Sequence, residues 1–305
     1  MHATMPEIND EGIVNLAKAR HPLLNKDNVV PIDIRLGEGY RTLLITGPNT
    51  GGKTVSMKTL GLLVLMTQSG LFIPVQSGSK ISIFQNVYAD IGDEQSIEQS
   101  LSTFSAHMRN IVNILNNIEH DDLLLLDEVG SGTDPEEGAA LAMSILERLM
   151  EIGACTVATT HYNELKTFAY SKEGIENACV EFDIKSLRPT YRLLIGTPGA
   201  SNAFAISKRL GLSDTLILRA QQLIKADHAQ FENVLNTLEN EKLMYEQKNA
   251  DIAERQQRIE KLEKQLADMS KKWLRKKSKH FVKLKNNVLV YFVVLVANLK
   301  KSSRN

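Results

Sequence analysis

Three short runs of apolar residues punctuate the first two thirds of the chain, and stretches with helical periodicity lie between and after them. The runs are Leu43–Thr46, Leu123–Asp127 and Thr156–Thr160. Their length is typical of strands buried on both faces, and their alternation with helical stretches predicts a mostly parallel sheet flanked by helices. We therefore expect an α/β fold, preceded by a lead-in of short strands and turns over residues 1–38.

Two helices and a helix pair are predicted around these runs. The first helix spans Val55–Met66. The second spans Pro135–Ile152, because Asp134 can accept hydrogen bonds as its N-cap and proline suits the first helical position. A pair of short helices is expected over residues 203–225, with a break at Gly211–Ser213.

The hydrophobic period changes after residue 225. Apolar residues then recur at every seventh position, which predicts a long helix with coiled-coil character. These positions are Phe231, Leu238, Tyr245, Ile252, Ile259, Leu266 and Trp273. The second row of the heptad is less regular, because Glu241, Lys248 and Arg255 interrupt it. The partner could be a second chain, another helix of a larger assembly, or the protein's own domain.

Charge is distributed unevenly along the chain. The 305 residues carry 36 basic and 36 acidic side chains, yet residues 271–305 hold 11 Lys and Arg and no acid, so the rest has a net charge of −11. The basic end can contact nucleic acid or another anionic surface, or remain a solvated tail. Its apolar run Val288–Ala297 is too short to span a membrane, so we expect no membrane partner.

The two cysteines, Cys155 and Cys179, lack the spacing of a metal site. Cys155 lies in an apolar strand pattern, which predicts a buried thiol. The N-terminus lacks the charged-then-apolar layout of a signal peptide, and nothing indicates an oxidising compartment. We therefore expect a cytoplasmic protein.

The candidate chemistry begins with a glycine-rich segment between the first apolar run and the first helix. It fits the pattern G-x-x-x-x-G-K-[ST] and comprises Gly47, Pro48, Asn49, Thr50, Gly51, Gly52, Lys53 and Thr54. Glycines let backbone N–H groups turn toward phosphate oxygens, and the helix N-terminus adds partial positive charge. Lys53, expected in a surface loop, would contact the β and γ phosphates. Thr54 would offer its hydroxyl to Mg²⁺.

Acidic residues end the second apolar run, and a histidine ends the third. Asp127 would hold Mg²⁺ directly or through water, and Glu128 would orient and deprotonate an attacking water. The position of this pair, seventy-odd residues after the glycine-rich segment and behind four leucines, strengthens an otherwise weak signal. His161 could hydrogen-bond the γ-phosphate and report its loss. A strand-end histidine is more often structural, so this assignment depends on the other two motifs.

Two further segments are rich in hydroxyls and backbone donors. One runs from Asp93 through Ser100 into the stretch 101–107, and the other spans Gly130–Asp134. Such residues are typical of helix caps. They could also contact a second nucleotide across an interface.

Four segments, in this order and spacing, resemble the ATPase domain of the MutS family. They are Gly-Pro-Asn-Thr-Gly-Gly-Lys-Thr, Ser-Leu-Ser-Thr-Phe, Leu-Asp-Glu-Val-Gly-Ser-Gly-Thr-Asp-Pro and Ala-Thr-Thr-His-Tyr. The resemblance covers roughly residues 13–225 and includes Arg20–Leu23. Thr50, Thr54 and Ser201–Phe204 are most similar to the second bacterial MutS subfamily, whose full-length members end in a Smr nuclease domain.

The resemblance implies an ABC-class P-loop ATPase that uses ATP and Mg²⁺ and forms a homodimer around ATP. It places Ser102 and Thr103 in a segment that reaches the partner's ATP, Asp134 in a loop that crosses the interface, and His161 at a switch. The helices at 203–225 match dimerisation elements. In the intact family the cycle acts on branched or recombining DNA, without sequence specificity, or on stalled ribosomes.

These observations divide the chain into an ATPase core at 39–225 with its lead-in, a long helix at 226–277, and a basic and apolar tail at 278–305. Lever, clamp and Smr segments of the family have no counterpart here, so we expect a fragment without nuclease activity. Two alternatives remain: an ABC-class ATPase of another branch, and a non-hydrolysing dimerisation fragment.

Overall fold

The computed structural model describes residues 3–25, 27–47, 51–92, 103–183, 188–199 and 203–223, together with single residues and short runs between 244 and 269. The chain divides into two compact units, Met1–Glu241 and Lys242–Asn305.

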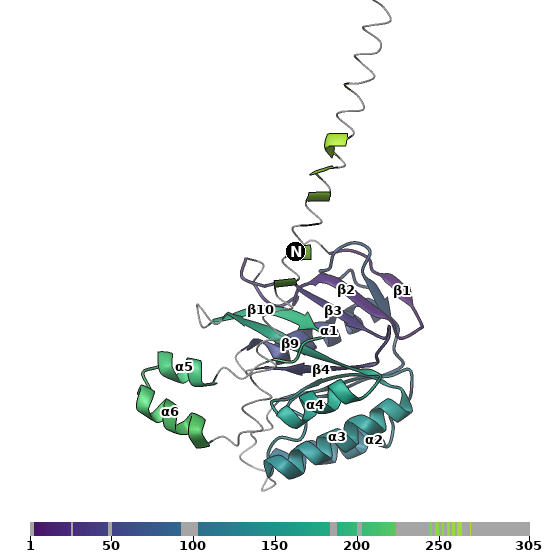
Figure 1. The fold of residues 1–305 in the computed structure, drawn as a ribbon. Coiled ribbons are helices and arrows are strands. Elements are labelled where there is room, and N and C mark those ends of the chain that lie inside the picture. The colour runs from purple at the N-terminus through teal and green to yellow at the C-terminus, as the bar shows by residue number, and fades with distance from the viewer. Residues whose placement is uncertain are drawn as a thin grey trace, which may run out of the picture. The chain divides into compact units, whose positions relative to one another are not determined.

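A six-stranded sheet forms the centre of the first unit, with strand order β10-β9-β4-β8-β7-β6. Its strands are β4 (Thr42–Thr46), β6 (Val87–Asp90), β7 (Leu123–Leu126), β8 (Cys155–Thr159), β9 (Ile175–Asp183) and β10 (Arg188–Ile195). Five of them run parallel, which confirms the predicted mostly parallel sheet, and β10 closes one edge as an antiparallel partner of β9. The three apolar runs are β4, β7 and β8, so they lie side by side (Figure 1).

A second, four-stranded sheet contains most of the lead-in. Its order is β1-β5-β2-β3, and its strands are β1 (Glu7–Asn9), β2 (Val14–Ala19), β3 (Ile32–Leu36) and β5 (Lys80–Ser82). Alternate residues of β3 are buried, as expected for a strand with one face on the core. The sequence predicts short strands here. It gives no sign that they pair with residues 80–82, because that pairing joins segments about seventy residues apart.

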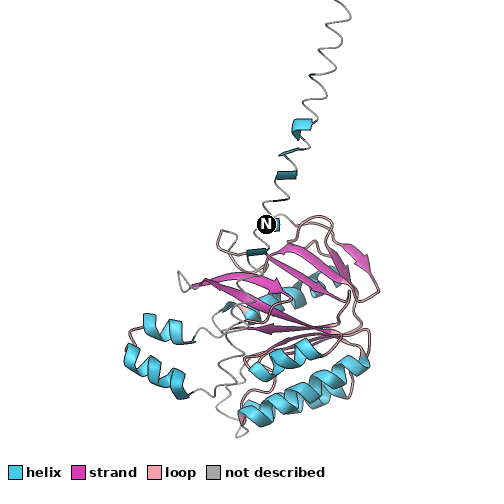
Figure 2. Ribbon diagram, viewed as in Figure 1, coloured by secondary structure: helices cyan, strands magenta, loops and turns pink. Residues whose placement is uncertain are grey.

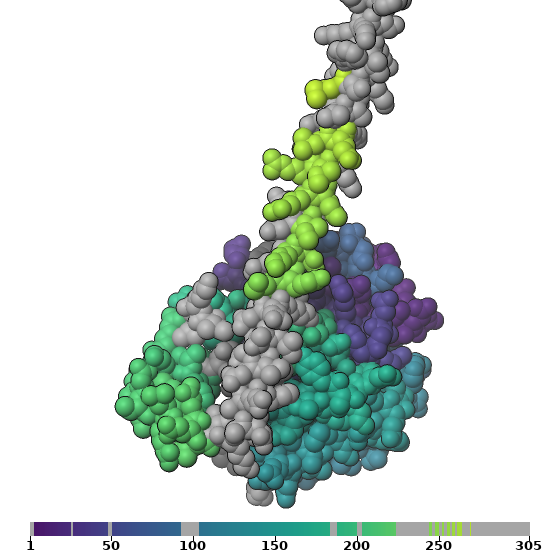
Figure 3. Space-filling model, in the orientation of Figure 1, coloured from purple at the N-terminus to yellow at the C-terminus, as the bar shows by residue number. Residues whose placement is uncertain are grey.

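The two faces of the large sheet are covered differently. Leu43 and Ile45 of β4 pack with helix α1 (Lys53–Gln68) and with the small sheet. Leu44 faces the other way and packs with α2 (Thr103–Leu115), α3 (Pro135–Ile152) and α4 (Asn163–Ser171). Figure 2 shows helices, in cyan, lying along the sheet. Each fully buried leucine contributes on the order of 1.5–3 kcal/mol, so both layers hold the sheet in place. With all atoms drawn, the purple and blue atoms of the N-terminal part lie above the teal atoms of the middle of the chain (Figure 3).

Local signals in the sequence account for the helix boundaries. Helix α3 has the predicted limits, with Asp134 as N-cap, Pro135 in the first turn and Gly153 in the left-handed conformation at the C-terminal end. Helix α1 is longer than predicted at both ends and begins at Lys53. The predicted helix pair is present as α5 (Ala203–Arg209) and α6 (Asp214–Leu223). The thiol of Cys155 is buried, as predicted.

In the second unit, the described residues between 244 and 269 are helical and exposed, among them Tyr245, Ile252 and Ile259 of the predicted heptad. Helix in this stretch agrees with the heptad pattern. Pairing into a coiled coil stays a prediction, and the remaining residues of 226–277 and the tail 278–305 lie outside the described residues. Where the structure describes the chain, none of its helices combines the length and apolar character that crossing a membrane requires.

Two buried threonines on β4 allow a test of the core. The hydroxyl of Thr46 donates to the carbonyl of Ala178 at 3.1 Å and accepts from the N–H of Gly199 at 2.7 Å. Thr42 is equally buried, yet its hydroxyl has no hydrogen-bond partner among the described residues. We expect Thr42→Val to be neutral or to stabilise by about 1 kcal/mol, because it removes an unsatisfied polar group.

Thr46→Val is the matched variant and should cost about 1–3 kcal/mol, because it leaves the Gly199 N–H unsatisfied. Urea unfolding of the two variants measures both effects. A Thr42→Val protein less stable than Thr46→Val would contradict this account of the buried hydroxyls.

Candidate functional site

The glycine-rich segment joins the C-terminal end of β4 to α1. Gly47 has φ +119° and Gly52, the N-cap of α1, has φ +95°, so both occupy backbone conformations that favour glycine. Gly51 is buried beside them. Pro48, Asn49 and Thr50 lie outside the described residues.

Lys53 is buried, contrary to the prediction of a surface-loop residue. It is the first residue of α1, is 1% exposed, and donates from Nζ to the carbonyl of Gly47 at 2.5 Å. Desolvation lowers the pKa of Lys53, while the carboxylates of Glu128 and Asp127 act in the opposite direction. The sequence could not show this burial, because the charged groups around Lys53, which are Glu128, Asp127 and Lys166, lie far from it in the chain.

Asp127 receives a hydroxyl on each of its carboxylate oxygens. Thr54 Oγ1 donates to Oδ2 at 2.8 Å, and Thr159 Oγ1 donates to Oδ1 at 2.5 Å. These contacts join the start of α1 and the end of β8 to the residue that follows β7. Thr54 and Asp127 are the two residues that the sequence predicts to face Mg²⁺, and the structure brings them into direct contact.

Glu128 has a strained backbone beside this pair. Its φ is +48°, a conformation that non-glycine residues rarely adopt and that often accompanies functional sites. Its N–H donates to the hydroxyl of Thr159 at 2.8 Å, and the next N–H, that of Val129, donates to the Thr159 carbonyl at 3.0 Å. Thr159 thus supports both acidic residues. Sequence reasoning missed it; the available signal was a hydroxyl at the end of an apolar strand adjacent to the acidic one.

The remaining predicted residues are distributed around this centre. His161 follows β8 and is exposed, with its ring centroid 4.4 Å from that of Tyr162. Asp134 caps α3 by accepting from the N–H groups of Glu136 and Glu137. Thr103 begins α2, but its side chain, like all of Ser102, lies outside the described residues.

Helix α2 is held at the same edge of the sheet. Buried Asp90, the last residue of β6, lies 2.8 Å from Nδ1 of His107 and accepts from the amide of Asn110 at 2.9 Å. The carbonyl of Asp90 also accepts from the N–H of Asp127 at 2.8 Å. Asp90 therefore connects the acidic pair to α2 by hydrogen bonds.

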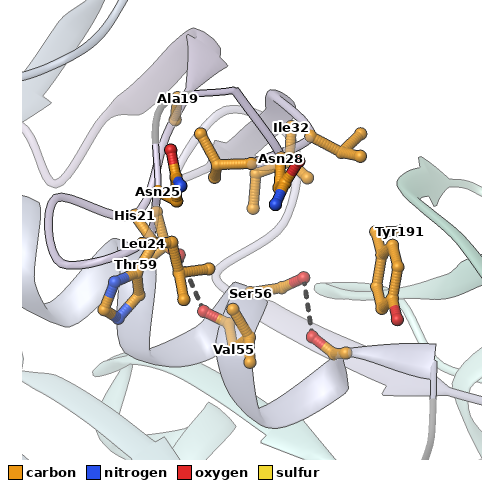
Figure 4. A pocket seen from close by; sticks show the side chains of 13 residues that line it. Ala19, His21, Leu24, Asn25, Asn28, Ile32, Val55, Ser56, Thr59 and Tyr191 are labelled. Atoms are coloured by element: carbon orange, nitrogen blue, oxygen red, sulfur yellow. Dashed lines mark hydrogen bonds between the residues drawn. The ribbon is translucent and has the colours of Figure 1, made fainter. Parts of the chain in front are cut away.

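A cavity of about 460 Å³ opens beside the first turns of α1. Gly52, Ser56 and Thr59 form one wall, and Tyr191 of β10 lies across the cavity from His21, Leu24 and Asn25 (Figure 4). Tyr191 has φ +61° within a register shift of the β9–β10 pair, and a Cβ on Gly52 would lie 3.2 Å from its ring. Its place in the wall was not predicted, because nothing in the local sequence links residue 191 to residue 52.

Four features together define the class of P-loop nucleoside triphosphatases. They are a parallel sheet, a glycine-rich loop after its central strand, a lysine and threonine at the start of the following helix, and an acid after the strand two places away. Within that class the chain belongs to the MutS family, because the family model described as MutS domain V matches residues 43–227.

Similar proteins include three that carry the name "Endonuclease MutS2". The Geobacillus sp. (strain WCH70) protein is 60% identical over 242 residues, covering 79% of this chain and 31% of the relative. The Acetivibrio thermocellus protein is 62% identical over 234 residues, covering 77% and 30%. The protein of Clostridium botulinum (strain Loch Maree / Type A3) is 55% identical over 289 residues, covering 95% and 36%. The chain thus spans about a third of the length of these relatives.

The capping contact of Asp134 can be separated from any further role. Asp134→Ala should destabilise the protein by about 1 kcal/mol, because two N–H groups at the start of α3 lose their acceptor, whereas Asp134→Ser should retain most of the stability. Urea unfolding measures the difference. Equal stability of the alanine variant and the wild type would contradict the capping role. A serine variant that is stable but turns over ATP slowly would reveal a second role for Asp134.

Proposed function

We propose that this chain binds and hydrolyses ATP with Mg²⁺, as the ATPase domain of a MutS2-type DNA-processing protein. The observation that carries the proposal is the meeting of Lys53, Thr54 and Asp127 at one edge of the large sheet, with Glu128 beside them. Domain V is the ATPase domain of MutS proteins, and the family match over residues 43–227 supports the same assignment.

In this proposal Lys53 exchanges the Gly47 carbonyl for the β and γ phosphates of ATP, assisted by the backbone N–H groups of residues 47–54 other than Pro48, which has none. The exchange is favourable because the ammonium is already desolvated and gains a doubly charged partner. Pro48, Asn49 and Thr50 belong to the proposed phosphate loop by sequence, although they lie outside the described residues.

The oxygens of Thr54 and Asp127 suit Mg²⁺, which prefers few protein ligands, all oxygen, and completes its shell with water and phosphate. The bound ion would neutralise charge that develops on the phosphates. Thr159 holds the other oxygen of Asp127 and so fixes the direction of the carboxylate. Glu128 would accept the proton of the attacking water, and His161 would contact the γ-phosphate.

The cavity beside α1 is the proposed site of the adenosine. It adjoins Gly52 of the phosphate loop, and its apolar residues suit a purine ring. The aromatic ring of Tyr191 offers a stacking surface on one side. The lead-in 1–38 would therefore contribute directly to nucleotide binding through His21, Leu24 and Asn25.

For the wider activity we propose a homodimer that forms when ATP binds. In this dimer the segment with Ser102 and Thr103, together with Asp134, contacts the partner's nucleotide. Helices α5 and α6 take part in dimerisation. The proposed ligand of the intact protein is branched DNA, without sequence specificity, or the ribosome. Any contact of this chain with nucleic acid would run through the basic residues 271–285. Nuclease activity is not proposed for it, although its relatives carry the name endonuclease.

Family membership decides against an ATPase of another ABC branch. A non-hydrolysing dimerisation fragment remains the second candidate. The presence of Lys53, Asp127 and Glu128 in one cluster argues against it, and the following two experiments decide between the candidates.

Lys53→Met should abolish detectable ATP binding, because it removes the cation while a chain of similar length fills the buried space. Binding of a fluorescent ATP analogue measures the loss. Lys58→Met, an exposed position on the same helix, is the control and should bind as the wild type does. Binding by Lys53→Met within a few-fold of the control would refute the phosphate-loop assignment.

Glu128→Gln should bind ATP but hydrolyse it at least ~100-fold more slowly, the usual scale for loss of a general base. An ATP-bound dimer should accumulate, because closing remains possible while the hydrolysis that reopens the dimer is lost. Phosphate release and size-exclusion chromatography with ATP and Mg²⁺ measure the two effects. Glu137→Gln, exposed in the first turn of α3, is the control. Undiminished turnover by Glu128→Gln would refute the assignment of Glu128 as the general base.

A further inference from the structure

The hydroxyl of Tyr162 connects two loops at the edge of the sheet. Tyr162 is 8% exposed, follows His161 directly and precedes α4. Its hydroxyl donates to the carbonyl of Gly130 at 3.1 Å, and its N–H donates to the hydroxyl of Thr160 at 3.2 Å. One side chain therefore links the turn 160–162 to the loop 129–134, which follows the acidic pair.

The loop at Gly130 packs closely against helix α3 next to this contact. A Cβ on Gly130 would overlap the carbonyl oxygen of Gly138 in α3, and a Cβ on Gly138 would overlap the carbonyl of Gly130. The same Cβ on Gly138 would also lie 2.9 Å from the hydroxyl oxygen of Tyr162. The loop at Gly130, helix α3 at Gly138 and the hydroxyl of Tyr162 are thus so close that no methyl group would fit between them. Closely packed elements of this kind shift together rather than deform.

The contact continues from the loop to α2. A Cβ on Gly132 would lie 3.2 Å from the Cβ of Phe104 and 3.3 Å from its backbone nitrogen. The first turn of α2 therefore packs on the same loop that Tyr162 holds at its other end. A continuous chain of contacts runs from His161 through Tyr162 and the loop 129–134 to Phe104.

We propose that Tyr162 is a positioning residue that transmits nucleotide-dependent displacement of the turn at His161 to the loop 129–134 and the start of α2. The proposal rests on the proposed function, since it assumes that His161 responds to the γ-phosphate. The proposal adds a physical connection between the response of His161 and the two segments proposed to face a second protomer, which are the loop 129–134 and the start of α2. Burial, with smaller contributions from Glu164, Asp134 and Glu128, raises the pKa of Tyr162.

Tyr162→Phe removes only the hydroxyl. The turnover number for ATP should fall about 5- to 10-fold, the scale of one hydrogen bond, while the Kd for a fluorescent ATP analogue stays within about 2-fold of the wild type. Tyr40→Phe is the matched control, because the hydroxyl of Tyr40, which precedes β4, also donates to a backbone carbonyl, that of Arg35 in β3, at 3.0 Å. It should leave both quantities unchanged.

A double-mutant cycle separates transmission from simple support of the fold. If Tyr162 acts through His161, Tyr162→Phe should lower turnover less than about 2-fold when His161→Ala is already present. An equal loss in both backgrounds, or wild-type turnover by Tyr162→Phe, would overturn the proposal. If Tyr162→Phe unfolds, Phe104→Leu, at the far end of the chain of contacts, gives a second cycle with His161→Ala. Additive effects on turnover in that cycle would likewise overturn the proposal. A wild-type protein that neither binds nor hydrolyses ATP would overturn the proposed function together with this inference.

Discussion

Parallel pairing of β8 with both β4 and β7 is the constraint on which the site depends. The carboxyl ends of adjacent parallel strands meet at one edge of a sheet, so the phosphate loop, the acidic pair and the turn at His161 become neighbours although they are far apart in the sequence. The buried hydroxyl of Thr159, at the end of the middle strand, satisfies Asp127 on one side and the N–H of Glu128 next to it. Strand order and hydrogen bonding thus reinforce each other.

Around this edge the protein tolerates several locally unfavourable features. Lys53 is buried, Glu128 has a left-handed backbone, and Tyr191 adopts a similar conformation in a distorted strand pair. Such features persist only where the surrounding structure holds them, and here two extensive apolar layers cover the faces of the sheet. Their concentration near the phosphate loop is consistent with a site selected for chemistry as well as for stability.

The two sheets have complementary roles in the candidate site. The large sheet supplies the phosphate loop and the acidic pair, while residues next to the strands of the small sheet form a wall of the cavity beside α1. This division places the N-terminal segment beside the candidate site. Its strands are also fixed by pairing with residues 80–82, so the wall cannot be separated from the rest of the domain.

The sequence by itself determined the features that depend on local chemistry: the buried strands, the limits of α3 with its cap at Asp134, and the glycine conformations at Gly47 and Gly52. Hydrophobic period, capping residues and glycine conformations act over a few residues, so they can be seen in the printed order. Only the tertiary structure decided that Lys53 is buried, that Thr159 supports the acidic pair and that Tyr191 faces Gly52. Thr159 and Tyr191 meet residues that lie far from them in the sequence, and strand order, which no local pattern encodes, determines which of these residues come together.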